Sequence, residues 1–149
     1  IEAAVGAMAE HACIVAEGAG AAGYAAILAD PDRFRDRRTA LVVCGGNIDQ
    51  RLLASVLLRG LVRAGQIIHL RVRISDAPGR LAAVARVIGD NGGNIVEIVH
   101  QRLFHDVPIK DTGIDAVVET RSRDHAKAIR AGLEAAGFAT QIINVTSVD

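Results

Sequence analysis

Two glycine-rich segments in the first third of the chain contain residues suited to binding a ligand. The first runs from Gly18 to Gly23 and is a literal G-x-G-x-x-G between the apolar segment Ile14–Ala16 and an alanine-rich helix predicted over 19–29. Such a motif predicts a dinucleotide site, because glycines let a pyrophosphate approach the helix N-terminus. That site also needs an acidic residue after the next strand, and the strand predicted over 39–43 is followed by Cys44. Close packing of helix and strand is therefore the favoured interpretation, with the dinucleotide site as an alternative.

The second segment runs from Cys44 to Asn47. It joins a continuous apolar strand predicted over Thr39–Val43 to a helix predicted from about Ile48 to Leu58, which Asn47 or Asp49 can cap. Open α/β sheets bind ligands at such a turn, beyond the carboxyl end of a buried strand. Cys44 is therefore a candidate ligand contact, and a buried thiol packed at the strand end is the alternative.

A third candidate site is the turn Asp76–Leu81. It follows Ile67–Ser75, where apolar and polar residues alternate as in a half-buried strand, and it precedes a helix with an apolar stripe over 81–88. Free amides at a helix N-terminus suit a carboxylate, and the side chain of Asp76 or Asn94 can accept hydrogen bonds from an ammonium group. A Pro-Gly turn without a ligand is the alternative.

The remaining elements of the second half predict an antiparallel sheet. Strands are expected over 95–102, 114–120 and 139–145, and a helix begins at the N-cap Ser122 and ends at Gly137. The order is βαββαβ, which is ferredoxin-like, with two helices on one face. No metal site is expected, because no pair of the histidines in this half has helical i, i+4 spacing and no cysteine accompanies them: His69, His100, His105 and His125.

Composition excludes several classes of function. Seventeen basic and seventeen acidic residues cancel, and aromatic residues make up 3% of the chain, so nucleic acid is not an expected partner. No apolar run approaches the roughly 20 residues of a membrane span, and two cysteines in separate segments suit a reducing compartment. We therefore expect a soluble cytoplasmic protein. The chain starts at Ile1, inside a predicted helix, so we expect a piece of a longer protein.

The succession of strand, Asp-x-Pro-Gly turn, helix, Gly-Gly-Asn-Ile and strand resembles the opening of an ACT domain, a small βαββαβ module that binds amino acids. The resemblance covers about half the chain and places an ACT regulatory domain at 67–149. It also implies a homodimer, which the open edges of so small a sheet favour on physical grounds. The residues that it implies for effector binding are Asp76, Ala77, Pro78, Gly79, Arg80, Leu81, Asn94 and Ile95.

The segment Val42–Asp49 resembles the end of the catalytic domain of threonine ammonia-lyases, which are pyridoxal-phosphate enzymes of the tryptophan-synthase-β type, fold type II. A second segment, Glu17 to Ala21, matches that family at a plausible distance upstream. The resemblance implies that 1–60 is a βαβα remnant of this domain, joined through a linker at 61–66 to the ACT domain. In the family, the residue at Cys44 hydrogen-bonds the pyridine nitrogen of the cofactor, and the implied cofactor contacts are Glu17, Cys44 and Gly45.

The lysine that such an enzyme needs for its Schiff base has no match in this chain. The sequence has only Lys110, in a predicted loop, and Lys127, on a polar helix face. We therefore expect no catalytic residue here, no cofactor held by this piece alone, and no lyase activity from it. The favoured function is the C-terminal regulatory portion of a threonine ammonia-lyase, whose ACT domain binds isoleucine or valine. A non-catalytic amino-acid-binding or dimerisation ACT protein is the alternative.

Overall fold

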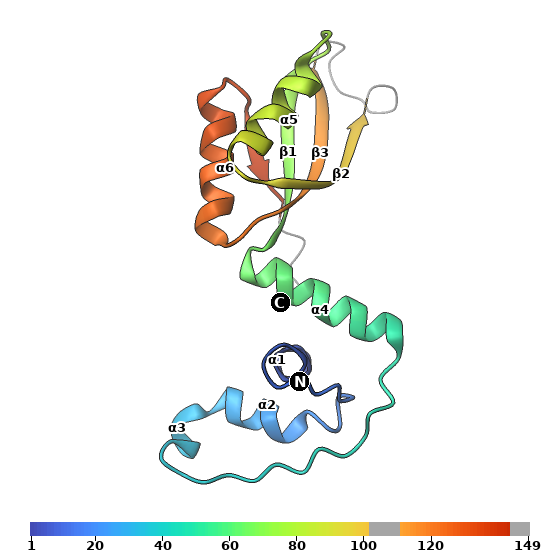
Figure 1. Cartoon of the computed structure of the whole chain (residues 1–149), viewed down its shortest axis with the longest axis vertical. Coiled ribbons are helices and arrows are strands. Elements are labelled where there is room, and N and C mark those ends of the chain that lie inside the picture. The colour runs from blue at the N-terminus through green and yellow to red at the C-terminus, as the bar shows by residue number, and fades with distance from the viewer. Residues whose placement is uncertain (102–110, 144–149) are drawn as a thin grey trace. The chain divides into compact units, whose positions relative to one another are not determined.

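The computed structural model describes residues 1–101 and 111–143, in two compact units (Figure 1). The first unit covers Ile1–Gly60 and the second Leu61–Asp149. The predicted strand at 139–145, the histidine at 105 and the lysine at 110 fall wholly or partly outside the described residues. No helix in the described ranges is long and apolar enough to cross a membrane.

The described first unit is built from helices. These are α1 (Glu2–Ala12), α2 (Ala22–Ala29), the single-turn α3 (Pro31–Phe34) and α4 (Gln50–Ala64), which continues into the second unit. The side chain of Asp30 caps α3 by accepting a hydrogen bond from the backbone N–H of Arg33. A small buried cluster holds this unit together and consists of Ala4, Val5, Met8, Ala16, Ala21 and Val56.

Both strands predicted for the first unit are wrong: 14–16 and 39–43 lie in irregular backbone. A strand needs a neighbour for its backbone N–H and C=O groups, and the described part of this unit offers none. The side chains are correspondingly open to solvent, since Val42 is 86% exposed and Val15 is 51% exposed. The predicted βαβα order is therefore not formed within this chain by itself.

Helix α4 also differs from the prediction, since it extends six residues past Leu58 and includes most of the predicted linker. Its last turn closes through hydrogen bonds from Gly65 N to Val62 O (3.0 Å) and from Gln66 N to Leu61 O (2.8 Å). Gly65 has φ +70°, which ends the helix in the way a C-terminal glycine usually does. Residues 61–64 are thus helical rather than a loop.

The second unit forms the four-stranded antiparallel sheet that the alternating pattern predicted. Its elements are β1 (Ile67–Ser75), α5 (Arg80–Asp90), β2 (Asn94–Gln101), β3 (Asp111–Glu119), α6 (Arg123–Ala135) and β4 (Thr140–Ile142). The sheet order is β2-β3-β1-β4, so β2 and β4 are the edges. Helix α6 begins where predicted, with the Ser122 side chain accepting a hydrogen bond from His125 N.

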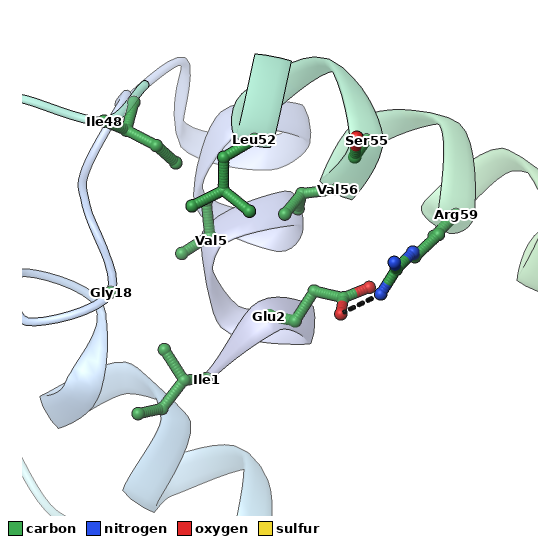
Figure 2. Close-up of a pocket in the computed structure, with 9 residues that line it drawn as sticks. All are labelled: Ile1, Glu2, Val5, Gly18, Ile48, Leu52, Ser55, Val56 and Arg59. Atoms are coloured by element: carbon green, nitrogen blue, oxygen red, sulfur yellow. Dashed lines mark hydrogen bonds and ion pairs between the residues drawn. The ribbon is translucent and has the colours of Figure 1, made fainter. Parts of the chain in front are cut away.

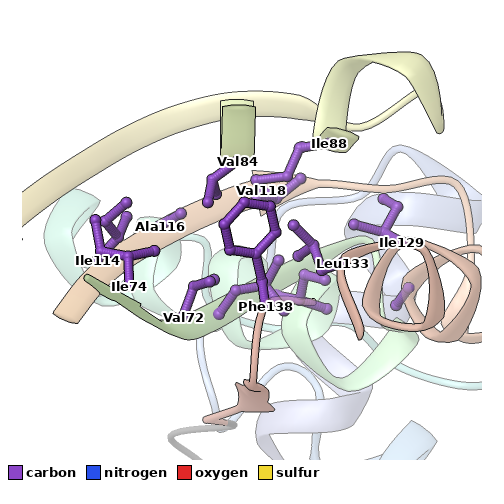
Figure 3. Close-up of a cluster of buried hydrophobic side chains, with 13 residues drawn as sticks. Val72, Ile74, Val84, Ile88, Ile114, Ala116, Val118, Ile129, Leu133 and Phe138 are labelled. Atoms are coloured by element: carbon purple, nitrogen blue, oxygen red, sulfur yellow. The ribbon is translucent and has the colours of Figure 1, made fainter. Parts of the chain in front are cut away.

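Both helices of this unit cover the same face of the sheet (Figure 3). Every second residue of β1, from Ile68 to Ile74, is buried against them, as are Ile114, Ala116 and Val118 of β3. Val84 and Ile88 come from α5, and Ala126, Ile129 and Leu133 come from α6. The apolar side chains of the two helices and of the buried face of the sheet therefore form one core.

Candidate functional site

The three residues implied as cofactor contacts come together in the first unit. Glu17 N donates a hydrogen bond to Gly45 O (3.2 Å), and Gly45 has φ +92°. A Cβ atom at Gly20 would lie 2.6 Å from Cys44 O, and one at Gly45 would overlap the Glu17 carboxylate. Only glycine fits at these two positions, so the backbones of the two glycine-rich segments can lie against each other with Cys44 beside them.

The same contacts favour the close-packing interpretation of the G-x-G-x-x-G motif. Gly20 faces the carbonyl groups of Cys44 and Gly45, and a Cβ atom at Gly23 would lie 3.1 Å from the Leu41 side chain. Helix α2 begins only at Ala22 and spans 8 residues, so most of the motif is turn. These glycines lie against protein backbone and side chains rather than around an open phosphate cradle.

A pocket of about 180 Å³ lies elsewhere in the first unit (Figure 2). Val5, Ile48, Leu52 and Val56 supply apolar walls, and an ion pair of 3.1 Å joins Glu2 to Arg59 at its side. Sequence reasoning missed this pocket because its walls come from α1 and α4, which are far apart in the chain. It does not include Glu17, Cys44 or Gly45, so it is separate from the implied cofactor contacts.

The turn Asp76–Leu81 leads into α5 as predicted. Gly79 is the N-cap with φ +83°, and among the described residues α5 has no side-chain cap. Arg80 N donates to Ala77 O (3.3 Å), so Leu81 and Ala82 supply the first-turn N–H groups that an acceptor could use. Arg80 lies beside the turn with its guanidinium 4.9 Å from the centre of the Phe138 ring. Its Nε atom is buried and has no hydrogen-bond partner within the described structure. A cation and free amides therefore share this end of the sheet.

Asn94 and Ile95 lie at the opposite end of the sheet. Asn94 pairs with Glu119, which pairs with Ile67 at the start of β1, whereas the turn follows Ser75 at its end. The eight steps from residue 67 to residue 75 correspond to about 26 Å at roughly 3.3 Å per residue. One chain therefore does not bring the two groups of predicted effector residues together. Sequence patterns could not show this, because register becomes visible only in the folded sheet.

Asn94 has a partner that the sequence analysis did not select. Its side-chain Nδ2 donates a hydrogen bond to Glu119 Oε2 (2.8 Å), while Ile95 is half-buried and packs on the core. The side-chain Oδ1 of Asn94 and the Glu119 carboxylate are hydrogen-bond acceptors at the same place, as an ammonium group requires. Sequence spacing did not indicate this contact, because Glu119 follows Asn94 by 25 residues and meets it only through the pairing of β2 with β3.

No family model matches the chain. Two curated relatives do: it is 34% identical over 134 residues to an L-threonine ammonia-lyase of Thermotoga maritima, and 34% identical over 140 residues to one of Geobacter sulfurreducens. The matches cover 90% and 94% of this chain. The predicted resemblance to threonine ammonia-lyases is confirmed. The chain spans about a third of the length of these relatives, which is consistent with a C-terminal piece.

Solved structures resemble the chain only weakly. A prephenate dehydratase from Staphylococcus aureus is 19% identical over 52% of this chain and 29% of its own, with a TM-score of 0.44. The regulatory subunit of aspartate kinase from Thermus thermophilus is 20% identical over 52% of this chain and 49% of its own, with a TM-score of 0.41. The resemblance to threonine ammonia-lyases therefore rests on sequence and not on these structures.

In a threonine ammonia-lyase, the cofactor would require a lysine, and the first unit, which contains Cys44, has no lysine in its sequence. Lys127 lies on α6 of the second unit, where its Nζ is 2.9 Å from the Asp124 carboxylate and lowers the pKa of that carboxyl. No cluster of potential metal ligands occurs within the described ranges either. The first unit therefore offers the Cys44 thiol as a hydrogen-bonding group, and it offers no side-chain amine for a Schiff base.

Proposed function

We propose that the chain is the C-terminal regulatory portion of a soluble, cytoplasmic threonine ammonia-lyase, which converts threonine to 2-oxobutanoate and ammonia. The observation that carries this proposal is the 34% identity over at least 90% of the chain to two such enzymes. The contact between Glu17 and Gly45 beside Cys44 adds to it, because the two segments implied by the family are adjacent in the structure as well.

In this proposal, the first unit completes the catalytic domain of the longer enzyme. Pyridoxal phosphate, when bound there, would supply the electron sink for elimination of the β-hydroxyl group. The Cys44 thiol is a neutral group that can hydrogen-bond the ring nitrogen, and Gly45 keeps the backbone close to Glu17. The exposed apolar segments at 14–15 and 41–43 would then pair with strands from the rest of the domain.

The second unit would act as an ACT domain that binds an amino-acid effector, with isoleucine or valine as the proposed ligand. The helix N-terminus and Arg80 suit the effector carboxylate, and Asn94 suits its ammonium group. Because about 26 Å separates these groups in one chain, the complete site requires a second copy.

The edge strand β2 offers a way to assemble that pair. Val96 and Val99 of this edge are exposed, and an unpaired edge readily accepts another strand. Two β2 strands that pair antiparallel around a two-fold axis place opposite ends of the two sheets side by side. The turn of one copy then lies near Asn94 of the other, and an effector would act by binding one arrangement of the pair more tightly than another.

Calorimetric titration with isoleucine, valine, threonine and serine tests this proposal. We expect saturable binding of isoleucine or valine by the wild type, an affinity at least about tenfold weaker in Asn94→Ala, and an unchanged affinity in the control Gln141→Ala, which alters an exposed residue of β4. Absence of heat from a folded dimer would leave the alternative of an assembly module. Turnover of threonine by this polypeptide would contradict the prediction that it is inactive alone.

A further inference from the structure

The corner between β3 and α6, residues 119–123, holds the C-terminal end of α4. Arg123 donates hydrogen bonds from Nε (3.1 Å) and Nη2 (2.5 Å) to the carbonyl oxygen of Arg63. Thr120 donates from its hydroxyl to Gly65 O and from its backbone N–H to Gln66 O (2.8 Å). The carbonyl group of Arg63, in the last turn of α4, and those of Gly65 and Gln66, which follow the helix, therefore receive donors from a single short segment.

The contact between the Arg123 guanidinium and the Arg63 carbonyl suits a helix C-terminus. The last carbonyl groups of a helix have no partner inside the helix and lie at the negative end of its dipole, so a guanidinium group is a suitable donor. The packing is also tight, because a Cβ atom at Gly65 would lie 2.5 Å from Arg123 Cγ. Thr120, which is only 9% exposed, is the buried polar residue of the described structure. Residues 63–66 are thus fixed to the corner at 119–123, within the second unit.

The same corner also holds the turn that leads to Asn94. Glu119 precedes Thr120 directly, and its carboxylate accepts the hydrogen bond from the Asn94 side chain. On the other side, His125 Nδ1 accepts from Arg121 N (3.0 Å), and His125 Nε2 lies 2.7 Å from Asn91 O. Residues 119–123 and the first turn of α6 therefore hydrogen-bond to two elements. One is the turn at 91–94, and the other is the last turn of α4.

We propose that this corner couples effector binding at Asn94 to the order of the last turn of α4, an inference that rests on the proposed effector site. An ammonium group at Asn94 competes for the Glu119 carboxylate and alters the Asn94–Glu119 hydrogen bond. Because Thr120 follows Glu119 in the backbone, the change reaches the hydrogen bonds to Gly65 and Gln66. Arg123 and Thr120 are positioning residues in this device, and neither contacts the effector.

Amide hydrogen exchange on the full chain tests the coupling, with and without saturating isoleucine or valine. The reporters are the N–H groups of Gly65 and Gln66, which close the last turn of α4. In the wild type, we expect effector to change their exchange rates by about threefold or more. In Arg123→Lys, which loses the two-pronged contact, and in Thr120→Val, which loses the hydroxyl, we expect that change to vanish while the affinity stays within about twofold. The control is Arg130→Lys, which should keep the full response. Arg130 lies on the same helix, where its Nε is 3.4 Å from the Glu134 carboxylate.

The outcomes separate this inference from the function on which it rests. If the wild type binds neither amino acid, the effector site is wrong and the coupling falls with it. If it binds but the Gly65 and Gln66 amides exchange at the same rate, the site stands and the coupling is wrong. The coupling is equally wrong if both variants keep the full response. Thr120→Val removes a buried hydrogen bond and could prevent folding. In that case the response of Arg123→Lys alone tests the coupling.

Discussion

The second unit buries one apolar face of its sheet, along β1 and β3, under α5 and α6, whereas the first unit leaves its apolar chain segments exposed. Among the described residues, thirteen buried ones form the core of the second unit, and six form the cluster of the first. In the second unit, each described strand pairs with another strand, while the apolar segments at 14–15 and 41–43 pair with no strand in the described structure. The second unit therefore has a packed sheet core, and the first unit has apolar segments that remain exposed in the described structure.

The sharpest test of this difference compares two leucines. Leu133 is fully buried in the core of the second unit, so Leu133→Ala removes packed methyl groups and leaves a cavity. We expect it to lower the free energy of unfolding by about 2–5 kcal/mol. The matched change Leu58→Ala, at a residue of α4 that is 54% exposed, is expected to cost less than about 0.5 kcal/mol. Urea unfolding measures both, and equal losses would contradict the comparison.

Two glycines of the second unit test how tightly its core is packed. A Cβ atom at Gly93 would lie 2.8 Å from Ile129 and 2.9 Å from Ile88, so Gly93→Ala is expected to destabilise by about 1–3 kcal/mol. A Cβ atom at Gly89 would meet nothing within 4 Å inside α5, so Gly89→Ala is expected to stabilise by up to about 1 kcal/mol. Thermal unfolding of both variants shows whether each change raises or lowers stability. An unchanged stability in Gly93→Ala would show that Ile88 and Ile129 can move to make room for a methyl group.

The sequence predicted the second unit well because its signals are local. The alternation from Ile67 to Ser75, the Asp-x-Pro-Gly turn and the Ser122 cap each depend on residues within one element, and all three are found in place. Strand formation at 39–43 depends on a neighbouring strand, so an apolar run could not predict it. The distance between Asn94 and the turn, and the Glu119 contact, depend on register across the sheet, which no local pattern contains.

The cap of α6 is expected to show a smaller effect. The Ser122 hydroxyl oxygen accepts from His125 N (3.2 Å), which satisfies one of the unpaired N–H groups in the first turn. We expect Ser122→Ala to cost about 1 kcal/mol. Ser55→Ala is the control, because Ser55 lies within α4 and its hydroxyl bonds only to the carbonyl of Arg51. Urea unfolding with a smaller loss for Ser122→Ala than for Ser55→Ala would show that the cap does not hold α6.

The smallest expected effect is the pH dependence from Asp124. A hydrogen bond from Lys127 lowers the pKa of this carboxyl below its usual value of about 3.9. Because the folded pKa is the lower one, the contribution to stability is present above about pH 4 and is lost as the pH falls through the lowered pKa. The pair is fully exposed, so we expect only a slight difference between wild type and Asp124→Asn. The free energies of unfolding of the two proteins, measured between pH 2 and pH 6, should differ at the upper end of this range, with the wild type more stable. A difference only below the folded pKa would contradict this account of Asp124.

The most direct test of the account is to record the backbone amide NMR spectrum of the whole chain while isoleucine is added. We predict that the amide signals of 76, 77, 79–81, 94, 95 and Glu119 shift and saturate together, because two copies would bring opposite ends of the second unit into one site. We also predict that the amides around Glu17 and Cys44 stay in place, since those residues are assigned to the cofactor. Shifts confined to residues 1–60, or no shifts with either isoleucine or valine, would contradict the assignment of the second unit as the effector-binding region.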